Sequence, residues 1–174
     1  MNTKKLISLL AALSLTVAHA WATDYTTPQY IDGETKTYEP GDTITILPGA
    51  GVANGLNIVS NATVSADNIV ITMGTENTPY EEREFNTVNV ATGSIMNVGS
   101  NTEINGYGRI SAGVQVVQDS TFSAVSGLKI NATDTRDLIG NGILVLYNSH
   151  ADLGTGASIS ANYAIVLGRG EIGS

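Results

Sequence analysis

Residues 114–130 read VQVVQDSTFSAVSGLKI, and this stretch contains three short segments in which apolar and polar residues alternate. Val114 and Val116 mark the first segment, Phe122 and Ala124 the second, and Ile130 the third. Alternation with a period of two is typical of a strand that buries one face and exposes the other. The stretch therefore predicts three short strands separated by turns.

The same pattern occurs five times along the chain, in copies that align at Leu56, Val88, Val114, Ile143 and Ala164. A repeated unit of this size cannot bury its own apolar face, so it must stack on its neighbours. We expect a solenoid with one coil of three strands per copy. The expected inward columns are Ile58, Val90, Val116, Val145 and Val166; then Val64, Met96, Phe122, Ala151 and Ile172; then Ala66, Val98, Ala124 and Leu153; and finally Ile104, Ile130 and Ile159, with Ile71 one residue early.

Stacking in register makes two specific pairs testable. Met96 and Phe122 occupy one inward column and should touch across adjacent coils. Glu103 and Lys129 each precede an inward isoleucine, so a period of two turns their side chains outward on neighbouring coils. The alignment predicts that these opposite charges lie side by side, contributing roughly 0.2–1 kcal/mol to stability.

Residues 1–20 have the order of a secretory signal. Lys4 and Lys5 precede an apolar run over residues 6–18, and small residues follow at Ala18 and Ala20. The run is too short for a transmembrane span, which needs roughly 20 residues, and no other apolar run approaches that length. We expect a signal peptide that is cleaved after Ala20, and no transmembrane segment in this chain.

Composition argues against several classes of function. The formal charge is −8, and it becomes −10 when Lys4 and Lys5 leave with the signal, so nothing in the chain attracts nucleic acid or anionic lipid. The chain has no cysteine, which rules out disulfides and thiolate metal sites. Charged residues make up 14% of the chain, against about 25% in a typical soluble domain. The polar surface must therefore consist mainly of Asn, Thr, Ser and Gly.

The mature chain divides into two parts. Residues 21–50 contain a predicted strand over residues 43–47, and we interpret them as an N-terminal cap that shields the first apolar layer; the alternative is an unstructured leader. Residues 51–174 contain the repeats, and because the fifth copy stops part-way we expect them to be truncated at the C-terminal end. Insertions over residues 74–86 and 131–140 follow the third strand of their copies, and they should project from one corner as binding loops or as solvated turns.

This organisation resembles the start of an autotransporter passenger of the adhesin or pertactin type. The resemblance rests on the signal, the cap and irregular strand triplets rich in Asn, Thr and Gly without Cys, and it covers roughly residues 40–174. It implies an all-β fold, namely a right-handed parallel β-helix with one three-strand coil per copy. It also implies that the chain is an N-terminal fragment of a larger exported protein.

No set of residues predicts a catalytic, cofactor-binding or metal site. His150 is the one histidine of the mature chain and falls in an outward column, so a surface position is expected rather than a catalytic base. The segment with Asp134, Arg136 and Asp137 lacks the glycine and the spaced oxygen ligands of a calcium loop. The tripeptide at residues 169–171 ends in Glu, whereas the integrin tripeptide ends in Asp.

Two further patterns have simple structural explanations. Glu81, Glu82 and Glu84 form an acidic cluster, but neighbours on an extended strand point to opposite sides, so they do not predict an acid/base pair. Asn61 and Asn131 each begin a glycan acceptor pattern, which we interpret as turn residues. Both patterns therefore predict exposed structural positions.

We expect a non-catalytic part of an exported passenger, adhesive or surface-structural in role, and not an enzyme. The alternative is a fragment of a secreted β-helical polysaccharide lyase or glycosidase, which would place carboxylates and basic residues in neighbouring columns of adjacent coils. Expected partners are a host-cell surface, the extracellular matrix, glycans or further copies of the chain, and not nucleic acid. The expected location is the cell surface or the medium if the parent protein has a translocating barrel, and otherwise the periplasm.

Overall fold

The computed structural model describes residues 21–47, 52–75, 84–134 and 140–173, so the predicted signal peptide lies outside the described residues. Within these ranges, no helix has the length and apolar character that a membrane crossing requires. The strands are β1 Asp24–Tyr25, β2 Gln29–Asp32, β3 Thr35–Tyr38, β4 Thr43–Ile46, β5 Asn54–Val59, β6 Thr63–Ala66, β7 Val70–Met73, β8 Phe85–Val90, β9 Ile95–Ser100, β10 Glu103–Gly108, β11 Ile110–Val116, β12 Thr121–Ser126, β13 Lys129–Asp134, β14 Asn141–Leu146, β15 His150–Asp152, β16 Ser158–Ala161, β17 Tyr163–Gly168 and β18 Glu171–Gly173.

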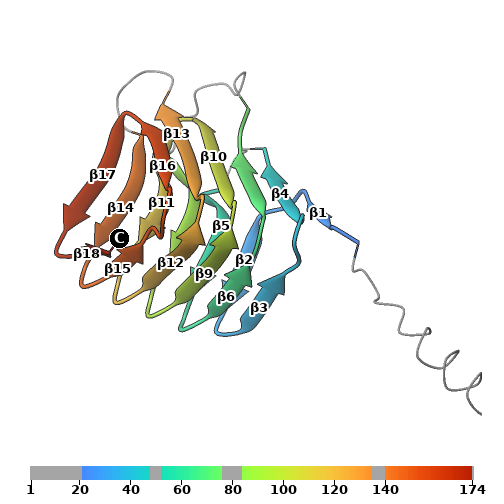
Figure 1. Cartoon of the computed structure of the whole chain (residues 1–174), viewed down its shortest axis with the longest axis horizontal. Coiled ribbons are helices and arrows are strands. Elements are labelled where there is room, and N and C mark those ends of the chain that lie inside the picture. Colours follow the sequence, from blue (N-terminus) through green and yellow to red (C-terminus); the bar gives the residue numbers. More distant parts are fainter. Residues whose placement is uncertain (1–20, 48–51, 76–83, 135–139, 174) are drawn as a thin grey trace, which may run out of the picture.

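These strands form three parallel sheets of six strands each. Sheet A has the order β1-β4-β7-β10-β13-β16, sheet B has the order β2-β5-β8-β11-β14-β17, and sheet C has the order β3-β6-β9-β12-β15-β18. The chain visits the sheets in turn, so each full coil takes one strand from each sheet and the coils stack along one axis (Figure 1). The molecule is a parallel β-helix, and the predicted all-β solenoid is confirmed.

The predicted apolar columns of the first four copies face the interior, whereas Val166 of the fifth copy, predicted to face inward, pairs with Leu144 in an outward column. In sheet B, Leu56, Val88, Val114 and Ile143 lie in register on successive coils, and all four are fully buried. Stacking of this kind removes each aliphatic side chain from water by placing it on the coils before and after it. The corresponding buried columns are Val64, Met96, Phe122 and Ala151 in sheet C and Ile44, Ile71, Ile104 and Ile130 in sheet A.

The two register pairs lie where the sequence places them. Met96 and Phe122 are partners on β9 and β12, and both are fully buried. Glu103 and Lys129 are partners on β10 and β13, which confirms the alignment of these coils. No ion pair joins these two side chains in the described part of the chain. Glu103 Oε1 instead accepts a hydrogen bond of 3.1 Å from Asn105 Nδ2.

The alignment of the fifth copy is wrong by one residue in its first strand. Ile143 pairs with Ile165 rather than with Ala164, whereas Ile172 pairs with Ala151 as predicted. The corner between β17 and β18 is one residue shorter than the corner between β14 and β15. Four successive apolar residues in β17 show no alternation, so the sequence has no signal there that fixes which face is inward.

Residues 21–47 form a coil at the start of the stack. Strands β2, β3 and β4 pair with β5, β6 and β7, and β1 pairs with the outer edge of β4. Tyr38 lies in register with the aliphatic column of the next coil, and Tyr25 packs edge-on against it with ring centroids 5.3 Å apart. Lys36 Nζ lies 5.4 Å from the centroid of the Tyr38 ring, within reach of a cation–π interaction. Lys36, Tyr25 and Tyr38 therefore cover the first aliphatic layer.

Replacing Tyr38 by Phe should leave the chain as stable at neutral pH, or more stable by up to about 1 kcal/mol. Tyr38 is 1% exposed and its hydroxyl has no hydrogen-bond partner among the described residues, so Phe keeps the ring packing and removes an unpaired buried group. Burial, and then the charges of Tyr25, Asp42 and Glu34, hold the pKa of Tyr38 well above its ordinary value of 10.0. As the pH rises above about 10, the unfolded chain therefore loses this proton first, and the wild type loses stability.

Urea unfolding at neutral pH and at about pH 11 measures both effects. The wild type should lose more stability between the two conditions than the Tyr38→Phe variant, because only the wild type has this hydroxyl. A variant that is less stable than the wild type by more than about 1 kcal/mol at neutral pH would contradict the prediction, since it would mean that the hydroxyl is hydrogen-bonded.

The corners between sheets B and C repeat one turn and one serine. Two successive residues with positive φ form the turn in four coils: Ser60 and Asn61, Thr92 and Gly93, Gln118 and Asp119, and Tyr147 and Asn148. The next residue is a buried serine in three of these coils, and its Oγ accepts a hydrogen bond of 3.2 Å from a backbone N–H of the preceding coil. These bonds run from Ala62 to Ser94, from Ser94 to Ser120, and from Ser120 to Ser149. The serine ladder satisfies buried donors that would otherwise destabilise the corner.

The connections at the corner between sheets A and B vary most in length. The predicted insertions over residues 74–86 and 131–140 are shorter than expected, because residues 85–86 belong to β8 and residues 131–134 to β13. Both lie in connections from sheet A to sheet B, from β7 to β8 and from β13 to β14. Residues 76–83 and 135–139 lie outside the described residues. Between β10 and β11 the same connection is the single residue Arg109. Sheets A and B approach closely near this corner, as Gly113 on β11 shows. A Cβ added to Gly113 would lie 2.6 Å from Ile130 Cγ2 on β13.

Candidate functional site

The outward columns are the surfaces on which a partner of this β-helix could bind. Each coil contributes one residue to a column, and adjacent rungs of a sheet are about 4.8 Å apart. Uncharged polar side chains occupy much of the N-terminal half of both sheets. One column of sheet B contains Tyr30, Asn57, Asn89, Gln115, Leu144 and Val166, and one column of sheet C contains Thr35, Thr63, Ile95, Thr121, His150 and Glu171.

Four asparagines of β5 and β8, namely Asn54, Asn57, Asn86 and Asn89, form an amide cluster on sheet B. Asn86 Nδ2 donates to Asn54 Oδ1 at 3.1 Å, and Asn89 Nδ2 donates to Asn57 Oδ1 at 2.7 Å. Asn54 Nδ2 also donates to Asn57 Oδ1 at 3.1 Å along β5, and this bond links the Asn54–Asn86 pair to the Asn57–Asn89 pair. Within the described ranges, Asn57 Nδ2 and Asn89 Oδ1 make no hydrogen bond, so a donor and an acceptor are left for a partner.

A shallow pocket lies beside the amide cluster at the N-terminal end of sheet B. Its volume is about 290 Å³, and the polar residues that line it are Gln29, Tyr30, Asn54 and Asn57. Tyr30 is 61% exposed, and it is the first residue of the outward column that continues with Asn57 and Asn89. None of the described residues that line the pocket carries a charge. We call this site the Tyr30 pocket.

A second amide ladder lies on sheet A. Asn131 Nδ2 donates to Asn105 Oδ1 at 2.6 Å, and Asn105 Nδ2 donates to Glu103 Oε1 at 3.1 Å. Asn131, interpreted from the sequence as a turn residue, therefore lies in strand β13 with a half-buried, hydrogen-bonded side chain. Asn61, the first residue of the other glycan acceptor pattern, does lie in an exposed turn with a φ of 62°.

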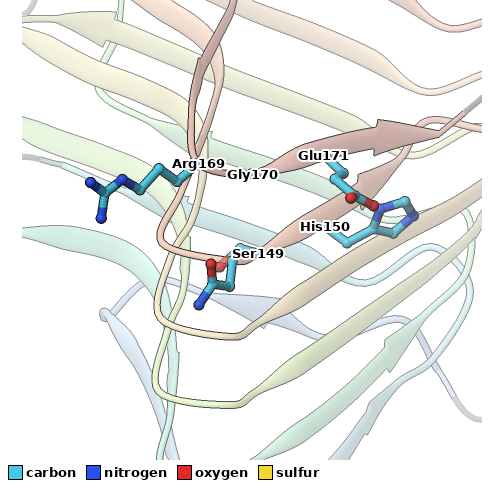
Figure 2. A pocket seen from close by; sticks show the side chains of 6 residues that line it. Ser149, His150, Arg169, Gly170 and Glu171 are labelled. Carbon is cyan, nitrogen blue, oxygen red and sulfur yellow. The ribbon is translucent and has the colours of Figure 1, made fainter.

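A second pocket, of about 510 Å³, lies at the C-terminal end of the stack and includes His150, Arg169 and Glu171. His150 on β15 and Glu171 on β18 are register partners on the outer face of sheet C. Figure 2 shows their side chains close together, whereas the side chain of Arg169 points the other way. Asp152 lies two residues beyond His150 and therefore on the same face. The half-buried His150 is thus in an outward column, as expected, with two carboxylates nearby.

Most of the acidic cluster identified in the sequence lies outside the described residues. Glu81 and Glu82 lie outside the residues that the structure describes, whereas Glu84 lies within them. Glu84 Oε1 forms an ion pair of 3.1 Å with Arg109 Nη2 at the corner between sheets A and B. Both side chains are about one-third exposed, so the pair contributes little to stability.

The segment compared with a calcium loop is also only partly described. Arg136 and Asp137 lie outside the described residues, and of Asp134 the strand position alone is described. In the ranges that the structure covers, no three His, Asp or Glu side chains are arranged to hold a metal ion. The site chemistry available there is therefore hydrogen bonding, aromatic packing and acid/base groups at His150 and its neighbours.

No protein-family model, curated protein or solved structure matches the chain. The outward columns and the two pockets are the features of this chain that bear on its function.

Sequence reasoning did not find the Tyr30 pocket or the amide cluster. Asparagine was interpreted as a turn and surface residue, which is its commonest role. The signal that could have found the cluster is spacing, because Asn54 and Asn86 lie 32 residues apart, as do Asn57 and Asn89. That separation equals the offset between the first two copies of the repeat, so the alignment places the two members of each pair opposite one another on adjacent strands.

Proposed function

We propose that this chain is part of an exported passenger of the autotransporter type, whose β-helix presents a non-catalytic adhesive or structural surface. Residues 1–20 act as the export signal in this proposal. The chain then reaches the cell surface or the medium if its parent protein has a translocating barrel, and otherwise the periplasm. Its partners are a host-cell surface, the extracellular matrix, glycans or further copies of the chain.

The observation that carries this proposal is the character of the outward columns. In the N-terminal half of the stack they present mainly uncharged amide and hydroxyl groups with regular spacing, as the amide cluster of Asn54, Asn57, Asn86 and Asn89 illustrates. Because hydrogen bonds already hold these side chains, a partner would immobilise few rotamers on binding. Solenoid surfaces of this kind are typical of proteins that bind extended partners.

An adhesion assay tests the proposal. The purified chain is applied to cultured epithelial cells and to wells coated with extracellular-matrix proteins, with the heat-unfolded chain as the control. We expect saturable binding by the folded chain and none by the control, because the outward columns exist only in the folded β-helix. If the folded chain bound to no surface at concentrations of about 10 μM, corresponding to about 7 kcal/mol of binding free energy, an adhesive role would be ruled out.

A second candidate function is that of a β-helical polysaccharide lyase or glycosidase, and the C-terminal pocket favours it. His150, Asp152 and Glu171 place an acid/base histidine and two carboxylates on adjacent rungs of sheet C. Incubation with a panel of polysaccharides, followed by assay of new reducing ends, tests this candidate. Activity that is lost in a His150→Ala variant would support it, and no release from any polysaccharide would exclude it.

A further inference from the structure

The Tyr30 pocket combines an exposed aromatic ring with a fixed set of amide groups. Tyr30, Asn57 and Asn89 follow one another in a single outward column of sheet B. At about 4.8 Å per rung, this column extends over about 10 Å. A ligand lying along it would contact the ring and both amides at once, which makes the column a binding site for something longer than a single small group.

The ring of Tyr30 suits the apolar face of a sugar. An aromatic face carries partial negative charge, and a pyranose ring presents C–H groups with partial positive charge on one face. Tyr30 is 61% exposed and belongs to β2, whose pairing with β5 fixes the backbone beneath it. The ring therefore projects from a paired strand rather than from a loop.

The amides of Asn57 and Asn89 suit the hydroxyl groups at the edge of a sugar. Asn57 Oδ1 is occupied by hydrogen bonds from Asn54 Nδ2 at 3.1 Å and Asn89 Nδ2 at 2.7 Å. Asn57 Nδ2 and Asn89 Oδ1 have no partner among the described residues, and a hydroxyl can both donate and accept. One free donor and one free acceptor on adjacent rungs therefore match neighbouring hydroxyls of one ligand.

The negative charge around the Tyr30 pocket favours a neutral ligand over an anionic one. No Lys or Arg is among the described residues that line the pocket, and the whole chain has a formal charge of −8. Asp32 is exposed two residues beyond Tyr30 on the same face of β2. A sulfated or sialylated glycan would meet like charge and no cation. Asp32 can accept hydrogen bonds from the hydroxyls of a neutral glycan.

We propose that the Tyr30 pocket and the outward column that continues from it bind a neutral glycan chain, with one pyranose ring stacked on Tyr30 and hydroxyls of the adjoining sugar units bonded to Asn57 and Asn89. This inference rests on the proposed adhesive function, because it names a ligand class for the surface that the β-helix presents. It assigns recognition to the N-terminal coils of sheet B rather than to the whole outer surface.

The test applies the purified chain to immobilised oligosaccharides. Neutral probes consist of glucose, galactose, mannose and N-acetylglucosamine units, and anionic probes carry sialic acid or sulfate. The wild type should bind a neutral probe, and Tyr30→Ala should weaken that binding about tenfold or more, whereas Tyr30→Phe should keep most of it. The matched control is Tyr163→Ala, which removes a tyrosine that is 55% exposed at the other end of sheet B and should bind as the wild type does.

Each outcome has a distinct meaning once circular dichroism shows that the variants are folded. Binding that is confined to anionic probes, or that Tyr30→Ala leaves unchanged, would overturn the inference. A wild type that adheres to cells or matrix but binds no glycan would also overturn it and would leave the adhesive function standing. A wild type that does neither would overturn both proposals.

Discussion

Phe122→Ala should lower the free energy of unfolding by about 3–5 kcal/mol, the range for emptying a fully buried aromatic site. Phe122 is fully buried in the middle of the stack, with Met96 and Ala151 as its register partners on the coils to either side. Backbone pairing on both sides prevents the coils from collapsing into the space that the ring leaves, so the cavity should persist. Because single domains are stable by about 5–15 kcal/mol, the loss is a large share of the total.

Urea denaturation followed by circular dichroism measures this loss. The matched control is Val125→Ala on the same strand, which truncates an apolar side chain that is 65% exposed, and it should change stability by less than about 0.5 kcal/mol. A loss below about 1 kcal/mol for Phe122→Ala would place the ring outside the core and contradict the register of sheet C.

Ile104→Asp should abolish cooperative folding at neutral pH. Ile104 is fully buried between Ile71 and Ile130 in the central column of sheet A, and these neighbours can neither hydrogen-bond nor neutralise a carboxylate. An unpaired buried charge belongs to the few changes that cost more than about 4–5 kcal/mol. Burial would raise the pKa of the new carboxyl above about 3.9, so the charge penalty should shrink as the pH falls towards about 4.

Two matched variants separate charge from shape at this position. The Asn side chain in Ile104→Asn has nearly the same shape as Asp but does not titrate. The loss of unfolding free energy relative to the wild type should therefore be the same for Ile104→Asn at neutral pH and at about pH 4. Thr133→Asp places the same carboxylate at an exposed position on β13 and should leave the chain folded. Equal stability of Ile104→Asp and the wild type at neutral pH would show that Ile104 does not face the core.

The central coils could be predicted from the sequence because their inward residues are aliphatic and their strands alternate. Val88, Val114 and Ile143 each begin a copy in which polar residues separate the apolar ones, so one register alone buries the set. The end coils lack one of these properties. In the last coil Ile165 follows another apolar residue, and in the first coil Lys36 takes an inward position that no aliphatic pattern would include.

The candidate site could be predicted less well than the core. Hydrophobic burial leaves a periodic record in a sequence, whereas a hydrogen bond between Asn57 and Asn89 depends on two coils being in register and on both side chains facing outward. Tyr30 has an aromatic side chain that could equally belong in the interior. Tyr30 is exposed because the neighbouring Ile31 is buried in the core, and adjacent side chains of a strand point to opposite faces. The pocket therefore becomes visible only when strand pairing is known.

The turn-by-turn pairing of this chain has a mechanical consequence. Each strand is bonded only to the strands of the coils immediately before and after it, as Met96 is to Val64 and Phe122. A force that pulls the two ends apart would therefore peel one coil at a time, and each step would release roughly 3.5 Å of contour per residue. An optical trap should record a staircase of short extensions at similar force, in contrast to the single rupture of a sandwich whose first and last strands are paired. A surface built in this way would yield gradually under shear while its inner coils kept their shape.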